Sequence, residues 1–266
     1  MTELLVAPLF AGLALALVLP LVGTLLRLRD EWLATLGLAH LAAAGALLGL
    51  AIHLPGFLGA LGGACVGVGA KQAVGGRGAS HSAYGLMILA GWALTLLIAA
   101  NTALGDALAH ALIDGQLYFA GGRELALTGA LLLVAWPAIL RLAPRLIVAR
   151  LFPATERANR LPAWRWHLGF DLLAATAIAV GTTTMGLMAS FALIFLPPWL
   201  AFRLAPDWRR AQWLAAGIGA AGYGLAFALA LAFDQPFGPV LVGVLLAVFV
   251  VVGLGRRPAS TDFLRK

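Results

Sequence analysis

Charged side chains are scarce in this chain of 266 residues. Only 11% of the residues are charged, whereas 62% are hydrophobic, and the mean hydropathy is +0.96. Soluble globular domains carry about 25% charged residues, so the composition excludes a soluble domain of this length. We therefore expect an all-α polytopic membrane protein that forms a single transmembrane domain over residues 1–266.

Cysteine and nucleotide-binding motifs are also scarce or absent. The single cysteine, Cys65, excludes an intrachain disulfide and a cysteine-based metal cluster, and we expect it to be a small buried thiol. The sequence has no GxxxxGKS or GxxxxGKT phosphate-binding loop, so we expect that the chain is not an ATPase. Glu3 is the only charged residue before the first apolar run. A secretory signal with a basic start is therefore not expected, and the first helix should remain in the mature protein.

Long apolar runs fill most of the chain. A helix needs about 20 residues to cross the hydrocarbon core of a bilayer, and the runs have about this length. They predict about nine membrane-spanning helices, with eight or ten as alternatives. The uncertain part is residues 167–202, which are too long for one span and short for two, and which we divide at Thr182, Thr183 and Thr184. The predicted spans are residues 4–25, 32–52, 55–73, 83–104, 124–141, 167–183, 185–202, 211–232 and 238–255.

The cationic residues are distributed unevenly between the gaps. Of the 18 Lys and Arg residues, 17 lie in five gaps that can all face one side of a membrane, and only Arg123 faces the other side. Because cytoplasmic loops carry an excess of Lys and Arg, this asymmetry predicts an external N-terminus and a cytoplasmic C-terminus. It also attributes the net charge of +7 to loops beside an anionic lipid leaflet and not to nucleic-acid binding.

Small residues recur at helix-packing spacing in the second and third runs. The positions are Gly45 and Gly49 in one run, and Gly59, Gly63 and Gly67 in the next. Glycines four residues apart let two helix backbones approach closely. We therefore expect these two helices to pack tightly against each other.

Ionisable residues inside a membrane are costly and are candidates for function. His40 lies in the middle of the second run. Its imidazole either hydrogen-bonds to a neighbouring helix or forms a transient metal or proton site. His81 and Asp171 lie near the cytoplasmic ends of predicted spans, where we expect their side chains to reach the lipid headgroups.

Four further candidates lie on the predicted external side. Asp106, His110 and Asp114 follow one another at a spacing of four residues, so a helix would place them on one face. Carboxylates and imidazoles suit a divalent first-row metal, although a solvated or partner-binding face is the commoner explanation. Asp234 lies in a turn rich in Pro and Gly, where it either caps a helix or takes part in cation entry.

Four segments of the chain resemble the motifs of one known family. The segment 186–201, GLMASFALIFLPPWLA, resembles its pattern VGALLVSALLIIPAATA, and Leu38-Ala39-His40 resembles the end of its GDxLAH motif. The remaining matches are Asp114, Tyr118 and Gly121 to DLxxYLFG, and Asp234, Pro236, Gly238 and Pro239 to DxPxGP. On these motifs the chain resembles the membrane permeases of bacterial ABC importers for zinc, manganese and iron.

The resemblance implies a transport subunit of the bacterial inner membrane that moves a divalent metal ion, zinc or manganese, as its substrate and binds no tight cofactor. It implies a homodimer surrounded by lipid, two cytosolic ABC ATPase subunits and an external metal-binding protein. Residues 150–165 would be the cytoplasmic coupling segment, with Glu156, Arg157 and Arg160 at the ATPase. The implied translocation path contains His40 and, near its external mouth, Asp234.

The chain also departs from the family pattern. Leu36 stands where the family has an acidic residue four positions before the histidine, and His81 stands where the family usually has an acid. Residues 103–112 look like an insertion. These departures keep two alternatives open: a permease of the same fold with a changed substrate such as a metal chelate, and a membrane-embedded enzyme or scaffold without an ATPase partner.

Overall fold

The computed structural model describes residues 2–74, 80–102, 115, 117–152, 154, 159 and 163–254. Within these residues the chain forms nine α-helices and one 3-10 turn, which confirms the predicted all-α class. The elements are α1 (Thr2–Leu28), α2 (Trp32–Ala51), α3 (Gly56–Val74), α4 (Ser80–Asn101), η1 (Leu117–Phe119), α6 (Gly122–Leu151), α8 (Ala163–Met185), α9 (Leu187–Leu204), α10 (Trp208–Ala232) and α11 (Phe237–Leu254).

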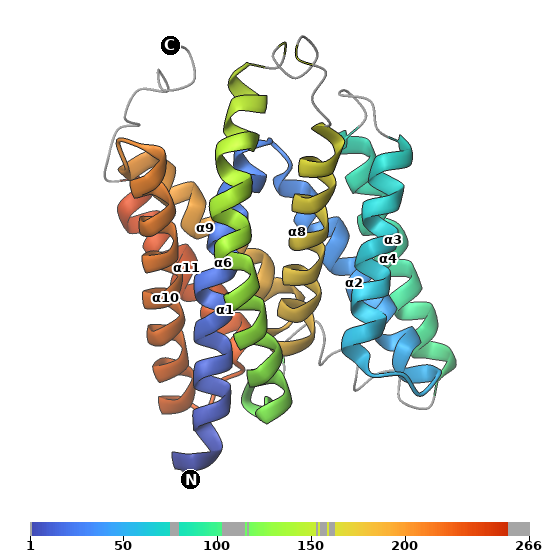
Figure 1. The fold of residues 1–266 in the computed structure, drawn as a ribbon. Coiled ribbons are helices and arrows are strands. Elements are labelled where there is room, and N and C mark those ends of the chain that lie inside the picture. Colours follow the sequence, from blue (N-terminus) through green and yellow to red (C-terminus); the bar gives the residue numbers. More distant parts are fainter. Residues whose placement is uncertain are drawn as a thin grey trace.

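The helices run alternately up and down a single bundle, and α1 begins at the end of it opposite to that at which α11 finishes (Figure 1). Among the described residues, seven helices are long and apolar enough to cross a membrane, all except α3 and α11. Helix α11 contributes a shorter apolar stretch, Phe237–Val252. We call the end at which α1, α3, α6 and α9 finish the cationic end, because Arg27, Lys71, Arg150 and Arg203 lie in the last turns of these helices.

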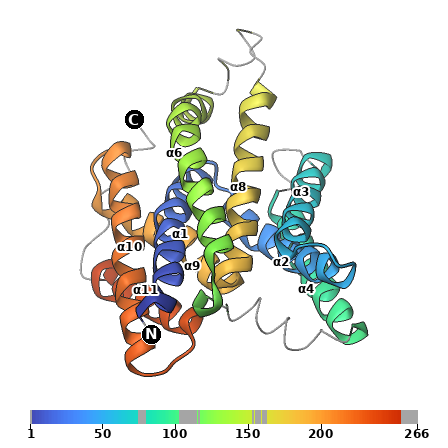
Figure 2. The ribbon, with the colours of Figure 1, turned by 60° about the horizontal axis from the view of Figure 1, so that its bottom comes forward.

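The bundle has two groups of helices joined by α8. Helices α2, α3 and α4 pack on one another at one side, whereas α1, α6, α9, α10 and α11 form the other group (Figures 1 and 2). Helix α8 lies between the groups and packs against α2 and α3 as well as against α1, α6 and α9. A movement between the two groups would therefore change the surfaces of α8 as well as the smaller direct contact between α2 and α9.

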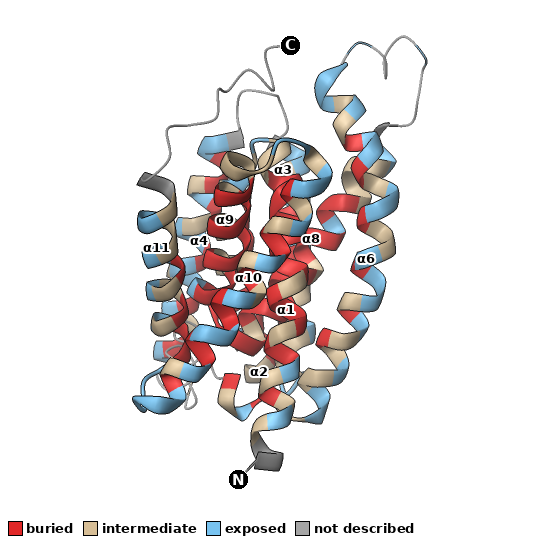
Figure 3. Ribbon diagram, turned by 90° about the vertical axis from the view of Figure 1, so that its left-hand side faces the viewer, coloured by how far each residue is buried: buried red, intermediate tan, exposed pale blue. Residues whose placement is uncertain are grey.

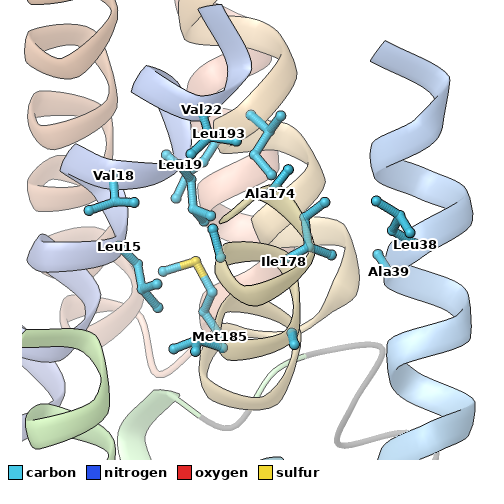
Figure 4. Close-up of a cluster of buried hydrophobic side chains, with 14 of the residues drawn as sticks. Leu15, Val18, Leu19, Val22, Leu38, Ala39, Ala174, Ile178, Met185 and Leu193 are labelled. Atoms are coloured by element: carbon cyan, nitrogen blue, oxygen red, sulfur yellow. The ribbon is translucent and has the colours of Figure 1, made fainter. Parts of the chain in front are cut away.

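The core lies where α1, α8 and α9 meet, and these helices are largely buried (Figure 3). Leu15, Leu19 and Val22 of α1 pack towards Ile178 of α8 and Leu193 of α9 (Figure 4). Helix α6 is exposed along most of its length (Figure 3). Its exposed positions include apolar side chains such as Leu133, which is 77% exposed. An outward apolar surface of this kind is expected of a helix that faces lipid.

The glycines of α2 and α3 have the predicted packing role. A Cβ atom on Gly45 would collide with the backbone oxygen of Gly59, and one on Gly59 would collide with the oxygen of Gly45. A Cβ atom on Gly63 would collide with the backbone oxygen of Leu41. The two helix backbones are therefore in direct contact, which only residues without a side chain allow.

Three helices end on a residue in the left-handed conformation that is not glycine. Asp30 (φ 60°), His53 (φ 62°) and Asp234 (φ 51°) follow α1, α2 and α10. The next residue donates its N–H to a carbonyl five positions back: Glu31 to Leu26, Leu54 to Gly49, and Gln235 to Ala230, at 2.8–2.9 Å. This is the hydrogen bond of a Schellman motif, and Asp and His are among the residues that tolerate the left-handed region best.

Two helices extend beyond the membrane spans that the sequence predicts for them. Helix α6 continues ten residues beyond the predicted end at residue 141, and α8 begins at Ala163 and not at residue 167. At 30 residues, α6 is about 45 Å long, which exceeds the roughly 30 Å of the hydrocarbon core. Its last turns, which carry Arg145 and Arg150, thus extend beyond the apolar layer. The end of α6 was predicted too early because Arg145 and Arg150 belong to the helix and do not mark its end.

Two local predictions are also corrected. Helices α8 and α9 are separate, as expected, but they meet at Gly186 (φ 94°) and not at Thr182–Thr184. Glycine adopts this conformation without steric cost, so it determines the junction. Cys65 was expected to be buried, but its side chain is exposed on α3. The helix face that packs against α2 is occupied by the neighbouring glycines.

Candidate translocation path and coupling surface

His40 lies in the middle of α2, where the structure leaves its side chain half-buried. Ala39 next to it is fully buried and faces α8 (Figure 4). On the side of α4, a Cβ atom on Gly91 would lie 2.7 Å from the Cβ atom of His40. Close packing by α4, and by α3 at neighbouring Leu41, fixes the backbone of this histidine, while its partial exposure leaves the imidazole accessible.

His40 has few ligand-type residues around it. No group of three or more His, Cys, Asp and Glu residues that could hold a metal ion occurs within the part of the chain that the structure describes. Leu36, one turn earlier on α2, is partly buried and packs against the core. A metal ion at His40 would therefore be held transiently by one imidazole and by ligands from water or other groups.

Asp234 lies at the end of the bundle opposite the cationic end, in the exposed turn between α10 and α11. Its left-handed backbone conformation forms the turn that ends α10, which agrees with the prediction that Asp234 ends a helix. Tyr118 of η1 is near enough for the Asp234 carboxylate to act on it electrostatically: burial, with a smaller contribution from Asp234, raises the pKa of the Tyr118 hydroxyl. The ring of Tyr118 packs against Phe227 and Phe237.

The remaining predicted site residues lie outside the described residues. These are Asp106, His110 and Asp114 of the external group, and Glu156, Arg157 and Arg160 of the coupling segment. The structure does describe residues near the two ends of that segment. Phe152 after α6 and Trp164 at the start of α8 are 61% and 63% exposed.

Aromatic rings accompany several arginines of the cationic end. The guanidinium carbon of Arg145 lies 3.3 Å from the ring centre of Trp166, and that of Arg203 lies 3.9 Å from Trp199. Trp residues concentrate at membrane–water interfaces, and an arginine above such a ring gains a cation–π interaction. These pairs indicate where the apolar layer ends on this side.

Asp171 was expected to reach towards lipid headgroups, and this prediction is wrong. Its side chain is only 3% exposed and forms ion pairs with Lys71 at 2.7 Å and Arg29 at 2.9 Å. Glu31 completes the cluster, since it pairs with both Arg29 and Lys71. We call Arg29, Glu31, Lys71 and Asp171 the charged ring. The signal that sequence reasoning missed was the presence of opposite charges in gaps assigned to the same side.

The fold and these surfaces define a polytopic membrane transport subunit. The chain belongs to the ABC 3 transport family, whose sequence model matches residues 1–255. It is therefore the membrane permease of an ABC transporter and not an enzyme, and ATP hydrolysis takes place in a separate chain. No curated protein is similar enough to match the chain.

Two solved structures have a similar fold. One is PsaBC from Streptococcus pneumoniae in complex with Fab, with a TM-score of 0.85 and 17% identity over 99% of this chain and 96% of that chain. The other is assigned to the metal-chelate type of ABC transporter and has an inward-facing conformation. It gives a TM-score of 0.73 with 16% identity over 94% of this chain and 85% of that chain.

Proposed function

We propose that this permease imports a divalent first-row metal ion, zinc or manganese, across the bacterial inner membrane. In this proposal two copies of the chain form the path, two cytosolic ATPase subunits power it, and an external metal-binding protein delivers the ion. Family membership and the fold support transport as the class. The half-buried imidazole of His40 in the middle of a spanning helix is the observation that favours a metal ion as the substrate.

The proposed orientation places the cationic end in the cytoplasm. The positive-inside rule supports it, because Arg27, Lys71, Arg150 and Arg203 lie in helix turns at that end. The opposite end carries the exposed Asp234 carboxylate. A cation would then approach an acidic entrance, pass His40 and leave at the cytoplasmic end. The exposed residues Phe152 and Trp164, near the two ends of the coupling segment, lie at this cytoplasmic end.

The roles of the predicted site residues follow from this arrangement. His40 is proposed to ligate the ion in the path, and Asp234 to attract it at the external mouth. Asp106, His110 and Asp114 are further candidates for external metal binding. Glu156, Arg157 and Arg160 are proposed to contact the ATPase. The ion is the substrate, and no tightly bound cofactor is proposed.

A changed substrate, such as a metal chelate, is the second candidate. Leu36 favours it, since an apolar side chain packed in the core replaces a potential ligand one turn from His40. A chelated metal brings its own ligands and needs fewer from the protein. Stimulation of the ATPase by chelates, and by no free divalent ion, would select this candidate.

His40→Ala is the direct test of the proposed function. We expect it to impair ATP-dependent uptake of zinc or manganese into proteoliposomes while assembly with the ATPase remains intact. His81→Ala is the matched control, because His81 is exposed in the first turn of α4, and this change should leave uptake unaltered. Uptake by His40→Ala at the rate of the unmodified transporter would remove this histidine from the path.

A further inference from the structure

The charged ring is closed, because each of its cations contacts both of its carboxylates. The four distances are 3.0 Å for Arg29–Glu31, 2.8 Å for Glu31–Lys71, 2.7 Å for Lys71–Asp171 and 2.9 Å for Asp171–Arg29. Two positive and two negative charges alternate, so the cluster is neutral. Gln72 adds a hydrogen bond from its Nε2 atom to Oδ2 of Asp171 at 3.0 Å.

The ring is shielded from water, although it lies at an end of the bundle. The exposed fractions of its side chains are 3% for Asp171, 10% for Arg29, 14% for Lys71 and 16% for Glu31. The fully buried ring of Phe170 lies 5.1 Å from the guanidinium carbon of Arg29. Among the described residues, the hydroxyl of fully buried Tyr84 has no hydrogen-bond partner.

The ring joins three parts of the fold that belong to different groups. Arg29 and Glu31 flank Asp30 in the left-handed turn between α1 and α2. Lys71 lies near the end of α3, and Asp171 lies eight residues after the start of α8. Helix α8 begins within the last residues of the coupling segment and packs against both groups. A contact that holds α8 to α3 therefore holds the groups together at the cationic end.

Stability alone does not account for four charges that are largely shielded from water at this place. Removing charges from water costs so much that a well-packed apolar cluster is often as stable as a buried ion pair or more so. The two kinds of contact differ in what happens when they separate. Separated apolar surfaces remain unfavourable in water, whereas separated charges become hydrated and recover much of the cost. An ionic contact is thus suited to a surface that must part and rejoin.

We propose that the charged ring closes the cytoplasmic end of the translocation path between α8, α3 and the α1–α2 turn. The intact ring holds this end shut. When α8 moves during the transport cycle, Asp171 parts from Lys71 and Arg29, water enters, and the path opens to the cytoplasm. The cytoplasmic location of this end and the coupling of its movement to ATP hydrolysis rest on the proposed function, whereas the closure of the cationic end by the ring does not.

A cysteine placed behind the ring can report the opening. Thr35 is 1% exposed and lies one helical turn deeper than Glu31 on the same face of α2. We would introduce Thr35→Cys together with Cys65→Ala and assemble this permease with its ATPase in inside-out vesicles. The measurement is the rate of reaction with a membrane-impermeant maleimide. A second reporter, Thr128→Cys, uses a buried threonine on α6 far from the ring.

Asp171→Asn is expected to raise the reaction rate at position 35 at least about tenfold, because it leaves two cations facing a single carboxylate. The rate at position 128 should not change, which separates local opening from unfolding. Asp207→Asn is the matched control, since its pair with Arg210 is largely exposed, at 48% and 74%, and asparagine still caps a helix. An unchanged rate at position 35 in Asp171→Asn would overturn the proposal.

Lys71→Gln provides a milder second variant in case Asp171→Asn does not assemble. It removes the two shortest ion pairs but keeps Arg29 between the carboxylates. The maleimide reaction rate at position 35 should therefore rise by an intermediate amount, and an unchanged rate would again contradict the closure. Addition of ATP to the transporter with an intact ring should also raise the rate at position 35. A rise with Asp171→Asn but none with ATP would support the closure and count against ATP-driven import.

Discussion

Gly63→Ala tests the contact between α2 and α3 that supports His40. A methyl group at position 63 would collide with the backbone oxygen of Leu41 and lie 2.9 Å from the carbonyl carbon of Leu41. Backbone atoms cannot rotate away, so the two helices must separate. Overpacking of this kind costs about 1–3 kcal/mol, while the better helix propensity of alanine returns about 0.5–1 kcal/mol.

The net loss, about 1 kcal/mol and at most about 2.5 kcal/mol, should lower the melting temperature in detergent by roughly 2–4 °C for each kcal/mol. Uptake should fall as well, because the displaced residue Leu41 adjoins His40 in the chain. The control is Gly62→Ala on the same helix. A Cβ atom there meets nothing within 4 Å, so this variant should melt at the same temperature or higher. Equal melting temperatures for the two variants would refute the close-contact argument.

Two further substitutions separate roles that the sequence leaves combined. Asp234→Asn removes the charge but keeps a residue that tolerates the backbone angle φ 51°. The melting temperature should therefore not change, while the KM for metal uptake should rise by about threefold to fivefold. An unaltered KM would exclude a role of Asp234 at the entrance. Tyr223→Phe removes hydrogen bonds of 3.0 and 3.2 Å to the carbonyls of Pro8 and Leu9 and should cost about 1 kcal/mol. Tyr118→Phe, whose hydroxyl has no hydrogen-bond partner within the described part of the chain, should cost nothing measurable in the same melting assay.

The global features of the fold were predictable because they depend on composition and on the spacing of apolar and small residues. The nine helices of the described residues and the packing through Gly45, Gly59 and Gly63 follow from apolar run length and glycine spacing. The separation of α8 from α9 follows from the distribution of the cationic residues between the two sides. Helix ends were less predictable. The length of α6 depends on cations that continue a helix, and the junction at Gly186 depends on one backbone conformation.

The charged ring shows why site prediction from sequence was incomplete. Lys71 and Asp171 are 100 residues apart, and Lys71 bonds to Glu31 over a separation of 40 residues. Each residue alone is equally compatible with a side chain that reaches the lipid headgroups. Only the packing of α8 between α3 and the α1–α2 turn brings the charges together and removes them from water.

The central claim, ATP-driven import of a divalent metal, is tested most directly by uptake into proteoliposomes that contain this permease with its ATPase and metal-binding protein. We predict that zinc or manganese accumulates only when ATP and the binding protein are both present, and that His40→Ala abolishes most of this accumulation. If neither metal accumulates, and neither stimulates ATP hydrolysis by the assembled transporter, the claim is contradicted.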